Sequence, residues 1–225
     1  IQKNSVTGPR LFEKILNEAA KTNLVLLNEN HYYPQHRILV YELLPKLKAL
    51  GYTHFALEGL DKGQDEVLNT ANSYPTVKTG FYTREQNFSN LLRFAKELGF
   101  TFIAYENFDN QKDREVGQAE NLYNKSFALH KEAKVVVLAG IDHILEAPTS
   151  SGKKWLAALL KEHYNLNPLT ISQTHLNLYR KHALHDYQLI SREDLSAIPN
   201  IPSVDYFLLN NRPEYLNIWE EKYPF

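Results

Sequence analysis

The strongest indication of the fold class is the segment KVVVLAGIDH, residues 134–143. Residues 135–139 are all apolar and leave no polar face, which is typical of a strand buried on both sides in a parallel sheet. A glycine, an aspartate and a histidine follow at the point where such a strand would end. The segment therefore predicts an interior strand that brings polar side chains to one edge of a sheet.

Shorter apolar runs of the same kind recur on both sides of this segment. They predict further strands at 24–27, 54–57, 100–104, 169–171 and 204–209. Patterns with helical spacing lie between them, at 35–50, 84–98, 113–132 and 153–163. Gly51 and Gly99 follow the first two patterns and mark helix ends, whereas Pro45 predicts a kink or a break. The alternation predicts an α/β fold with a mainly parallel central sheet flanked by helices.

The chain length of 225 residues fits one large domain, so we expect a single α/β domain over 1–225. Residues 61–99 are interpreted as a helical and loop insertion. Within it, residues 61–83 are polar and lack a clear period, which favours a lid over one edge of the sheet. Residues 172–225 are less regular than the rest and form the C-terminal part.

The composition restricts the classes of partner and of chemistry. The formal net charge of -1 gives no field that favours nucleic acid, so we expect none as a partner. The absence of cysteine excludes thiolate nucleophiles and zinc–thiolate sites. No apolar run reaches the ~20 residues of a transmembrane span. Because Ile1 is not an initiator methionine, we interpret the chain as a processed, extracytoplasmic protein, either secreted or a lipoprotein.

Titratable side chains follow four of the predicted strands directly. Glu29 and His31 follow the first, Glu58 the second, Glu106 the third and His143 the strongest. Ligands of parallel α/β sheets bind outside the carboxyl ends of the strands, so these side chains are expected to share one site. We predict that the catalytic residues are Glu29, His31, Glu58 and His143. Supporting roles are predicted for His36, Glu106 and Arg114.

Two chemistries fit this set of residues. Two imidazoles and a carboxylate form a workable site for a divalent metal, which gives His31, Glu58 and His143 as ligands. A bound metal would convert water into a nucleophile. Without metal, a histidine could take a proton from water and a carboxylate could donate one. The residue types leave both alternatives open.

The motifs resemble those of the haem-uptake/Tiki superfamily, which includes ChaN-like lipoproteins, erythromycin esterases and TraB/Tiki-type proteases. LLNENH at 26–31 resembles the opening strand and Gly-Glu-x-His, and Ala56-Leu57-Glu58-Gly59 the second-strand glutamate. Gly140-Ile141-Asp142-His143 resembles the second Gly-x-x-His. Arg114-Glu115 with Ala119 and Asn121 resembles a helix of ChaN-like members. Asn28 replaces the first glycine, and because asparagine tolerates positive φ, we expect the turn to persist.

The resemblance implies three alternative functions. The first is hydrolysis of an ester or amide, in a small-molecule or peptide substrate, at the His/Glu site. The second is binding of haem or a related iron ligand without catalysis, as in ChaN-like members. Tyrosine and histidine can both ligate haem iron, which makes Tyr32, Tyr33 and Tyr105 candidates together with Tyr82. The third is a superfamily member that keeps the site and lacks activity.

Overall fold

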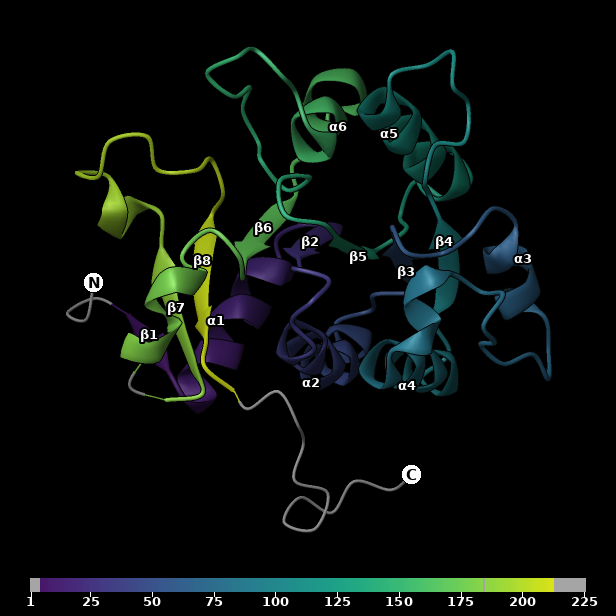
Figure 1. Cartoon of the computed structure of the whole chain (residues 1–225), viewed down its shortest axis with the longest axis horizontal. Coiled ribbons are helices and arrows are strands. Elements are labelled where there is room, and N and C mark those ends of the chain that lie inside the picture. The colour runs from purple at the N-terminus through teal and green to yellow at the C-terminus, as the bar shows by residue number, and fades with distance from the viewer. Residues whose placement is uncertain (1–4, 184, 213–225) are drawn as a thin grey trace, which may run out of the picture.

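The computed structural model describes residues 5–183 and 185–212. One eight-stranded sheet runs through them in the order β1-β7-β8-β6-β2-β5-β3-β4 (Figure 1). The strands are β1 (Val6–Thr7), β2 (Leu24–Asn28), β3 (His54–Leu57), β4 (Thr101–Ala104), β5 (Val135–Ala139), β6 (Leu169–Ser172), β7 (Tyr187–Ser191) and β8 (Tyr206–Asn210). Neighbouring strands from β8 to β4 pair in parallel, whereas β7 is antiparallel to both β8 and β1.

Helices cover both faces of the sheet. One face carries α1 (Pro9–Ala19), α2 (Gln35–Ala49) and α4 (Gln86–Glu97), and the other carries α5 (Arg114–Lys125) and α6 (Leu156–Tyr164) (Figure 1). The short helix α3 (Gln64–Asn69) lies beside the edge strand β4. The predicted α/β class with a mostly parallel sheet between helices is therefore confirmed.

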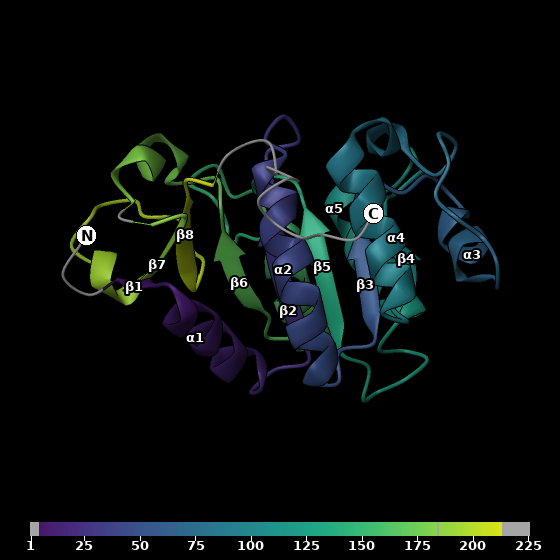
Figure 2. The same ribbon diagram turned by 90° about the horizontal axis from the view of Figure 1, so that it is seen from below.

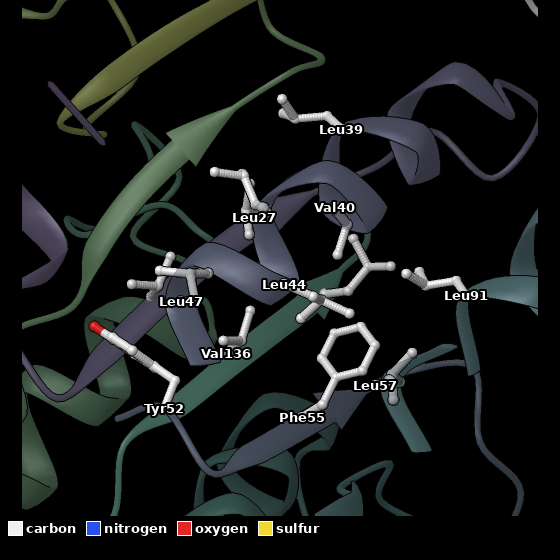
Figure 3. Packing of buried hydrophobic residues seen from close by; sticks show 14 of the residues in the cluster. Leu27, Leu39, Val40, Leu44, Leu47, Tyr52, Phe55, Leu57, Leu91 and Val136 are labelled. Carbon is white, nitrogen blue, oxygen red and sulfur yellow. The ribbon is translucent and has the colours of Figure 1, made fainter. Parts of the chain in front are cut away.

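The two apolar clusters of the core explain why β5 has no polar face. Val136 and Leu138 belong to the apolar cluster under α2 and α4, whereas Val135 and Val137 belong to the cluster under α5 and α6. Side chains of α2, such as Leu44, pack on residues of β2, β3 and β5 (Figure 3). Because successive side chains of a strand point to opposite faces, a central strand needs apolar residues at every position.

Several predicted boundaries differ from the structure. The helix predicted at 113–132 ends at Lys125, and the residues after it form turns. Helix α2 continues through Pro45 without a break. Gly51 and Gly99 have positive φ, as predicted for residues that end a helix. Helix α1 and strand β7 were not predicted.

Residues 61–99, which were predicted as an insertion, contain α3, the 3-10 helix η1 (Phe81–Arg84) and α4, and α4 packs on the core as one of the helices that cover the sheet. Two further 3-10 helices, η2 (Asn177–His182) and η3 (Glu193–Leu195), flank β7 in the C-terminal part. Residues 213–225 of that part lie outside the described residues. In the described part of the chain, no helix combines the length and apolar character needed to cross a membrane.

Candidate functional site

The site lies where β2, β5 and β3 end side by side. The register pairs Asn28 with Ala139 and Leu57 with Leu138, so the three strands reach the same edge together. Arrowheads of β5 and β6 point to this edge in Figure 2. The residues that follow the strands are Glu29–His31, Glu58 and Gly140–His143. The structure thus brings the four predicted catalytic residues to one edge of the sheet.

A buried carboxylate orients His31. Glu29 Oε1 lies 2.8 Å from His31 Nδ1, and Glu29 is 2% exposed. A carboxylate only accepts hydrogen bonds, so Nδ1 carries a proton, and in the neutral ring the lone pair then lies on Nε2. Burial alone would raise the pKa of Glu29, but hydrogen bonds from His31 and Arg37 outweigh it and hold the pKa below its ordinary value. The pair therefore presents a basic imidazole nitrogen.

Arg37 fixes the buried end of this pair. Its Nε and Nη2 donate to the two oxygens of Glu29 at 2.7 and 2.8 Å, and its Nη1 donates to Glu85 at 2.6 Å. Arg37 is 1% exposed, so its guanidinium neutralises the negative charge of Glu29 in a position that water does not reach. Glu85 also caps α4 by accepting two backbone N–H bonds. The ring of Tyr82 stacks on His31 at 4.3 Å between centroids and limits its rotation.

Two carboxylates hold His143 on the other side of the site. Its Nδ1 lies 2.8 Å from Glu115 Oε2, and its Nε2 lies 3.3 Å from Glu58 Oε1. Burial alone would lower the pKa of His143, but the hydrogen bonds to Glu115 and Glu58 raise it to about 9. His143 is therefore an imidazolium at neutral pH. Glu115 is itself buried and also accepts the backbone N–H of Leu156 at 3.1 Å.

Arg114 lies next to this imidazolium and is half-exposed. It donates to Glu58 Oε1 at 2.6 Å and to Glu106 Oε1 at 3.0 Å, and its Nη1 is 3.4 Å from His143 Nε2. Glu58 lies between the two cations. Burial alone would raise its pKa, but hydrogen bonds from His143 and Arg114 lower the pKa to about 2. Gln118 also donates to Glu106, which therefore positions Arg114.

Gly140 provides the space in which these groups meet. A Cβ at this position would lie 3.0 Å from Glu58 Oε2, 3.3 Å from His143 Cδ2 and 3.5 Å from His31 Nε2. The backbone N–H of Gly140 also donates to Glu58. Gly140 is not among the glycines with positive φ, so the glycine is needed for space and not for its conformation.

The residues present do not fit a divalent metal. Among residues 5–183 and 185–212, no group of three or more His, Asp or Glu side chains is placed to hold one. Glu29, Glu58 and Glu106 each pair with an arginine, which would repel a cation. Both nitrogens of His143 face carboxylates. The predicted metal set of His31, Glu58 and His143 therefore lacks free ligand atoms on two of its three members.

The predicted supporting and haem residues differ in accessibility. His36 is buried, its Nδ1 accepts the backbone N–H of Asn30 at 3.0 Å, and burial lowers its pKa to about 4. It thus positions the loop after β2 as a neutral ring. Tyr105 is fully buried and donates to Leu138 O, so its hydroxyl cannot reach a haem iron. Tyr33 stacks on His36, whereas Tyr32 is 89% exposed.

Asn28 has a structural role that explains the departure from glycine. Its side chain donates to Ile141 O at 2.7 Å and to Thr174 Oγ1 at 2.6 Å, and it accepts the N–H of Gln173 at 2.7 Å. It is the last residue of β2 and does not have positive φ, so the expected reason for its tolerance was wrong. Asn28 joins the loops that follow β5 and β6.

A chain of three polar side chains lies beside this joint. Ser172 Oγ is 2.7 Å from His175 Nδ1, and His175 Nε2 is 3.1 Å from Asp142 Oδ1. The order resembles a hydrolytic triad, but Ser172 is fully buried and its oxygen accepts the N–H groups of His175 and Thr174. Ser172 is therefore no nucleophile here. The chain instead holds the loop that carries His143.

Sequence reasoning did not foresee the contacts of four residues at the site. Arg37, Glu85 and Glu115 were not predicted as site residues, and Tyr82 was considered only as a haem ligand, whereas its ring stacks on His31. Only Glu115 had a usable signal, because it follows Arg114 in the helix that resembles the ChaN-like motif. Arg37 and Tyr82 lie on helices and Glu85 lies between η1 and α4, and a single charged or aromatic residue at such positions is ordinary.

A separate cavity of about 790 Å³ lies at the opposite edge of the sheet. It is lined by α1, by the beginnings of β6 and β8 and by the end of β7, and it contains no residue of the candidate site. Acidic and basic side chains are mixed along it, and Glu18 there is already bound by Lys14 and Lys21. The cavity therefore gives no indication of a ligand.

Comparisons with known proteins show the fold alone. No family model and no curated protein matches the sequence. The type III effector HopBA1 has a similar structure, with TM-score 0.54, 15% identity, and coverage of 87% of this chain and 91% of that one. ChaN of Campylobacter jejuni, described as binding haem cofacially, gives TM-score 0.51 and 13% identity over 88% of this chain and 91% of that one.

The C-terminal region of Pasteurella multocida toxin, described as having a thiol-protease-like catalytic triad, is also similar. It gives TM-score 0.50 and 17% identity, with 74% of this chain and 25% of that chain covered. The similarity to ChaN and HopBA1 supports the ChaN/Tiki-like fold that the motifs predicted. At such identities it extends no further than the fold.

Proposed function

We propose that this protein is a hydrolase that cleaves an ester or amide without a metal ion. The proposal rests mainly on one observation: Nε2 of the Glu29-oriented His31 has no hydrogen-bond partner in the described part of the chain and lies beside Gly140, as Glu58 and His143 do. Addition of water to a carbonyl needs a base that takes a proton from the water and cations that stabilise the charge developing on the carbonyl oxygen. The site has a base on one side and cations on the other.

His31 is the general base in this proposal. Its Nε2 takes a proton from water while Nδ1 stays bonded to Glu29, and the resulting hydroxide adds to the carbonyl carbon of the substrate. Glu29 is buried and paired with Arg37, so it remains charged and stabilises the imidazolium formed on His31. When the tetrahedral intermediate breaks down, the proton passes from His31 to the leaving oxygen or nitrogen.

Arg114 stabilises the negative charge that develops on the carbonyl oxygen, and His143, whose two N–H groups are bonded to Glu115 and Glu58, contributes through its positive charge alone. Both are cationic at neutral pH and lie 3.4 Å apart at the edge of the site. Glu58 orients them by accepting from both. Groups fixed in advance by such bonds do not need to reorganise during the reaction, which is the main source of their effect.

The experiment is a screen of chromogenic esters and amides in the presence of a chelator, with His31→Gln and His143→Gln. We expect turnover to survive the chelator and to fall about 10²–10⁴-fold in either variant. His163→Gln, which changes an exposed histidine near the end of α6, is the matched control and should keep the wild-type rate. Equal rates in the wild type and both site variants would overturn the proposal, as would turnover that requires added metal.

Haem binding is the second candidate, and the exposed Tyr32 beside His31 favours it. The ChaN of Campylobacter jejuni, which shares the fold, is described as a haem-binding protein. The phenol of Tyr32 is free to ligate an iron at the surface, whereas that of Tyr105 is not. Titration with haem should then give a Soret band that weakens in Tyr32→Phe and persists in Tyr74→Phe, which changes another exposed tyrosine. No spectral change in the wild type would exclude this candidate. A chain with neither turnover nor haem binding would be the inactive alternative.

A further inference from the structure

Exposed apolar side chains surround the candidate site. We call them the apolar rim, and they are Tyr32, Phe81, Phe108, Ile141, Leu178 and Tyr179. They lie on the five connections that leave the carboxyl ends of β2, β3, β4, β5 and β6, so the chain order assigns them to one edge of the sheet. Leu178 and Tyr32 are 90% and 89% exposed. Single exposed apolar side chains are normal on a protein surface, whereas a group of them at one edge indicates an interaction site.

The rim adjoins the side chains of the candidate site. Tyr32 follows His31, and Phe81 contacts Tyr82, whose ring stacks on His31. Ile141 follows Gly140, and its carbonyl is held by Asn28. A surface that binds the rim would therefore lie directly over the site.

Basic side chains accompany the apolar ones on the two short helices of this edge. In η1, exposed Arg84 lies over the ring of exposed Phe81. In η2, Leu178 and Tyr179 are followed by Arg180 and Lys181. Within the described residues, no carboxylate pairs with Arg84 or Lys181, whereas Asp186 pairs with Arg212. Asp142 binds His175, but burial lowers the pKa of His175, so this pair leaves the negative charge of Asp142 in place. The unneutralised charge of both helices is positive.

We infer that the apolar rim is a docking surface for an anionic lipid bilayer. Leucine and aromatic side chains enter the boundary between headgroups and acyl chains, and arginine and lysine extend to the phosphates. This pairing of exposed apolar residues with free basic residues matches an anionic interface in both apolar character and charge. The docked protein has its candidate site open toward the bilayer. The inference does not depend on catalysis.

The test is flotation of the full chain with two kinds of vesicle, phosphatidylcholine alone and phosphatidylcholine mixed with phosphatidylglycerol. The variant Phe81→Ser with Leu178→Ser removes two protruding side chains and should reduce binding at least about tenfold. Arg84→Ser with Lys181→Ser should reduce binding to the mixed vesicles about fivefold per residue and leave binding to neutral vesicles unchanged. The matched control is Leu129→Ser with Ile198→Ser, which removes exposed apolar side chains from connections at the opposite edge. Circular dichroism checks that every variant is folded.

Binding to the mixed vesicles that is lost with the rim and kept in the control would support the inference. Absence of flotation with either vesicle would overturn it, as would equal binding of the rim variant and the control. A wild-type dimer that the rim variant dissociates, together with no vesicle binding, would show that a second copy occupies the rim and would also overturn it.

Discussion

Arg37→Met tests how much of the protein's stability depends on neutralising the buried charge of Glu29. Methionine keeps an unbranched stem against Phe88, whose ring lies 5.0 Å from the guanidinium carbon. It removes the three charged hydrogen bonds to Glu29 and Glu85. The buried carboxylate of Glu29 then keeps His31 as its only side-chain partner among the described residues. The change isolates the electrostatic part of the arrangement from its packing.

The expected loss of stability at pH 7 is about 3–5 kcal/mol, because breaking a buried pair leaves an uncompensated charge. For a domain of this size the melting temperature should fall by about 6–20 °C. In the wild type, the lowered pKa of Glu29 gives stability that is present above its unfolded pKa and lost on acidification. In the variant, burial without Arg37 raises the pKa, so protonation at low pH relieves the cost. The difference between the two proteins should therefore narrow toward pH 4.5.

Thermal melts followed by circular dichroism between pH 4.5 and pH 7 measure both quantities. Arg93→Met, which changes an arginine on the outer side of α4, is the control and should cost less than about 0.5 kcal/mol. Adding Glu29→Gln to Arg37→Met should recover part of the stability, because it removes the buried charge. The reasoning is refuted by a loss below about 1 kcal/mol at pH 7, or by a loss that does not change with pH.

Three further changes have definite expected results. Gly140→Ala should leave the melting temperature within a few degrees but lower kcat/KM about 10²-fold, since the new Cβ would separate the reacting groups; an unchanged rate would contradict the geometry. Glu115→Gln should reduce the pH dependence of stability. In the wild type, the raised pKa of His143 contributes stability that is present below about pH 6.5 and is lost as the pH rises through 9. Thermal melts at pH 6 and pH 9.5 measure this loss, and an equal loss in the wild type and the variant would contradict the assignment. Asn28→Ala should cost about 2–4 kcal/mol, because it leaves buried partners unsatisfied, and urea unfolding measures the cost; a neutral result would show that the joint between the two loops has no effect on stability.

The sheet was predictable because each interior strand has its own signal. Buried parallel strands require apolar residues on both faces, so runs such as 135–139 identify them without any partner. The strand ends then located Glu29, His31, Glu58 and His143. Helix boundaries were less predictable, because the polar pattern at 113–132 continues past Lys125 into turns that have similar composition.

The contacts that decide the chemistry were not predictable. Arg37 lies in an apolar helix pattern, and its burial follows from tertiary contacts with Glu29 and Glu85 that no local spacing encodes. The choice between metal and metal-free chemistry depends on where Arg114 points, which also requires the structure. Residue types predicted that these side chains lie together at one edge of the sheet, and the structure shows how their charges pair.

The position of β5 constrains the order in which the site can form. β5 lies between β2 and β3 in the sheet, although it follows β2, β3 and β4 in the sequence. A nascent chain that ends before residue 135 has Glu29 and Glu58 on strands with no backbone pairing to each other. The two carboxylates acquire their final spacing only when β5 enters the sheet. Insertion of this central strand is a contact of high sequence separation, which slows folding and exposes unpaired edges until it is complete. We therefore expect no N-terminal fragment that lacks β5 to retain a partial site, and hydrogen exchange during refolding should protect β2, β3 and β5 together.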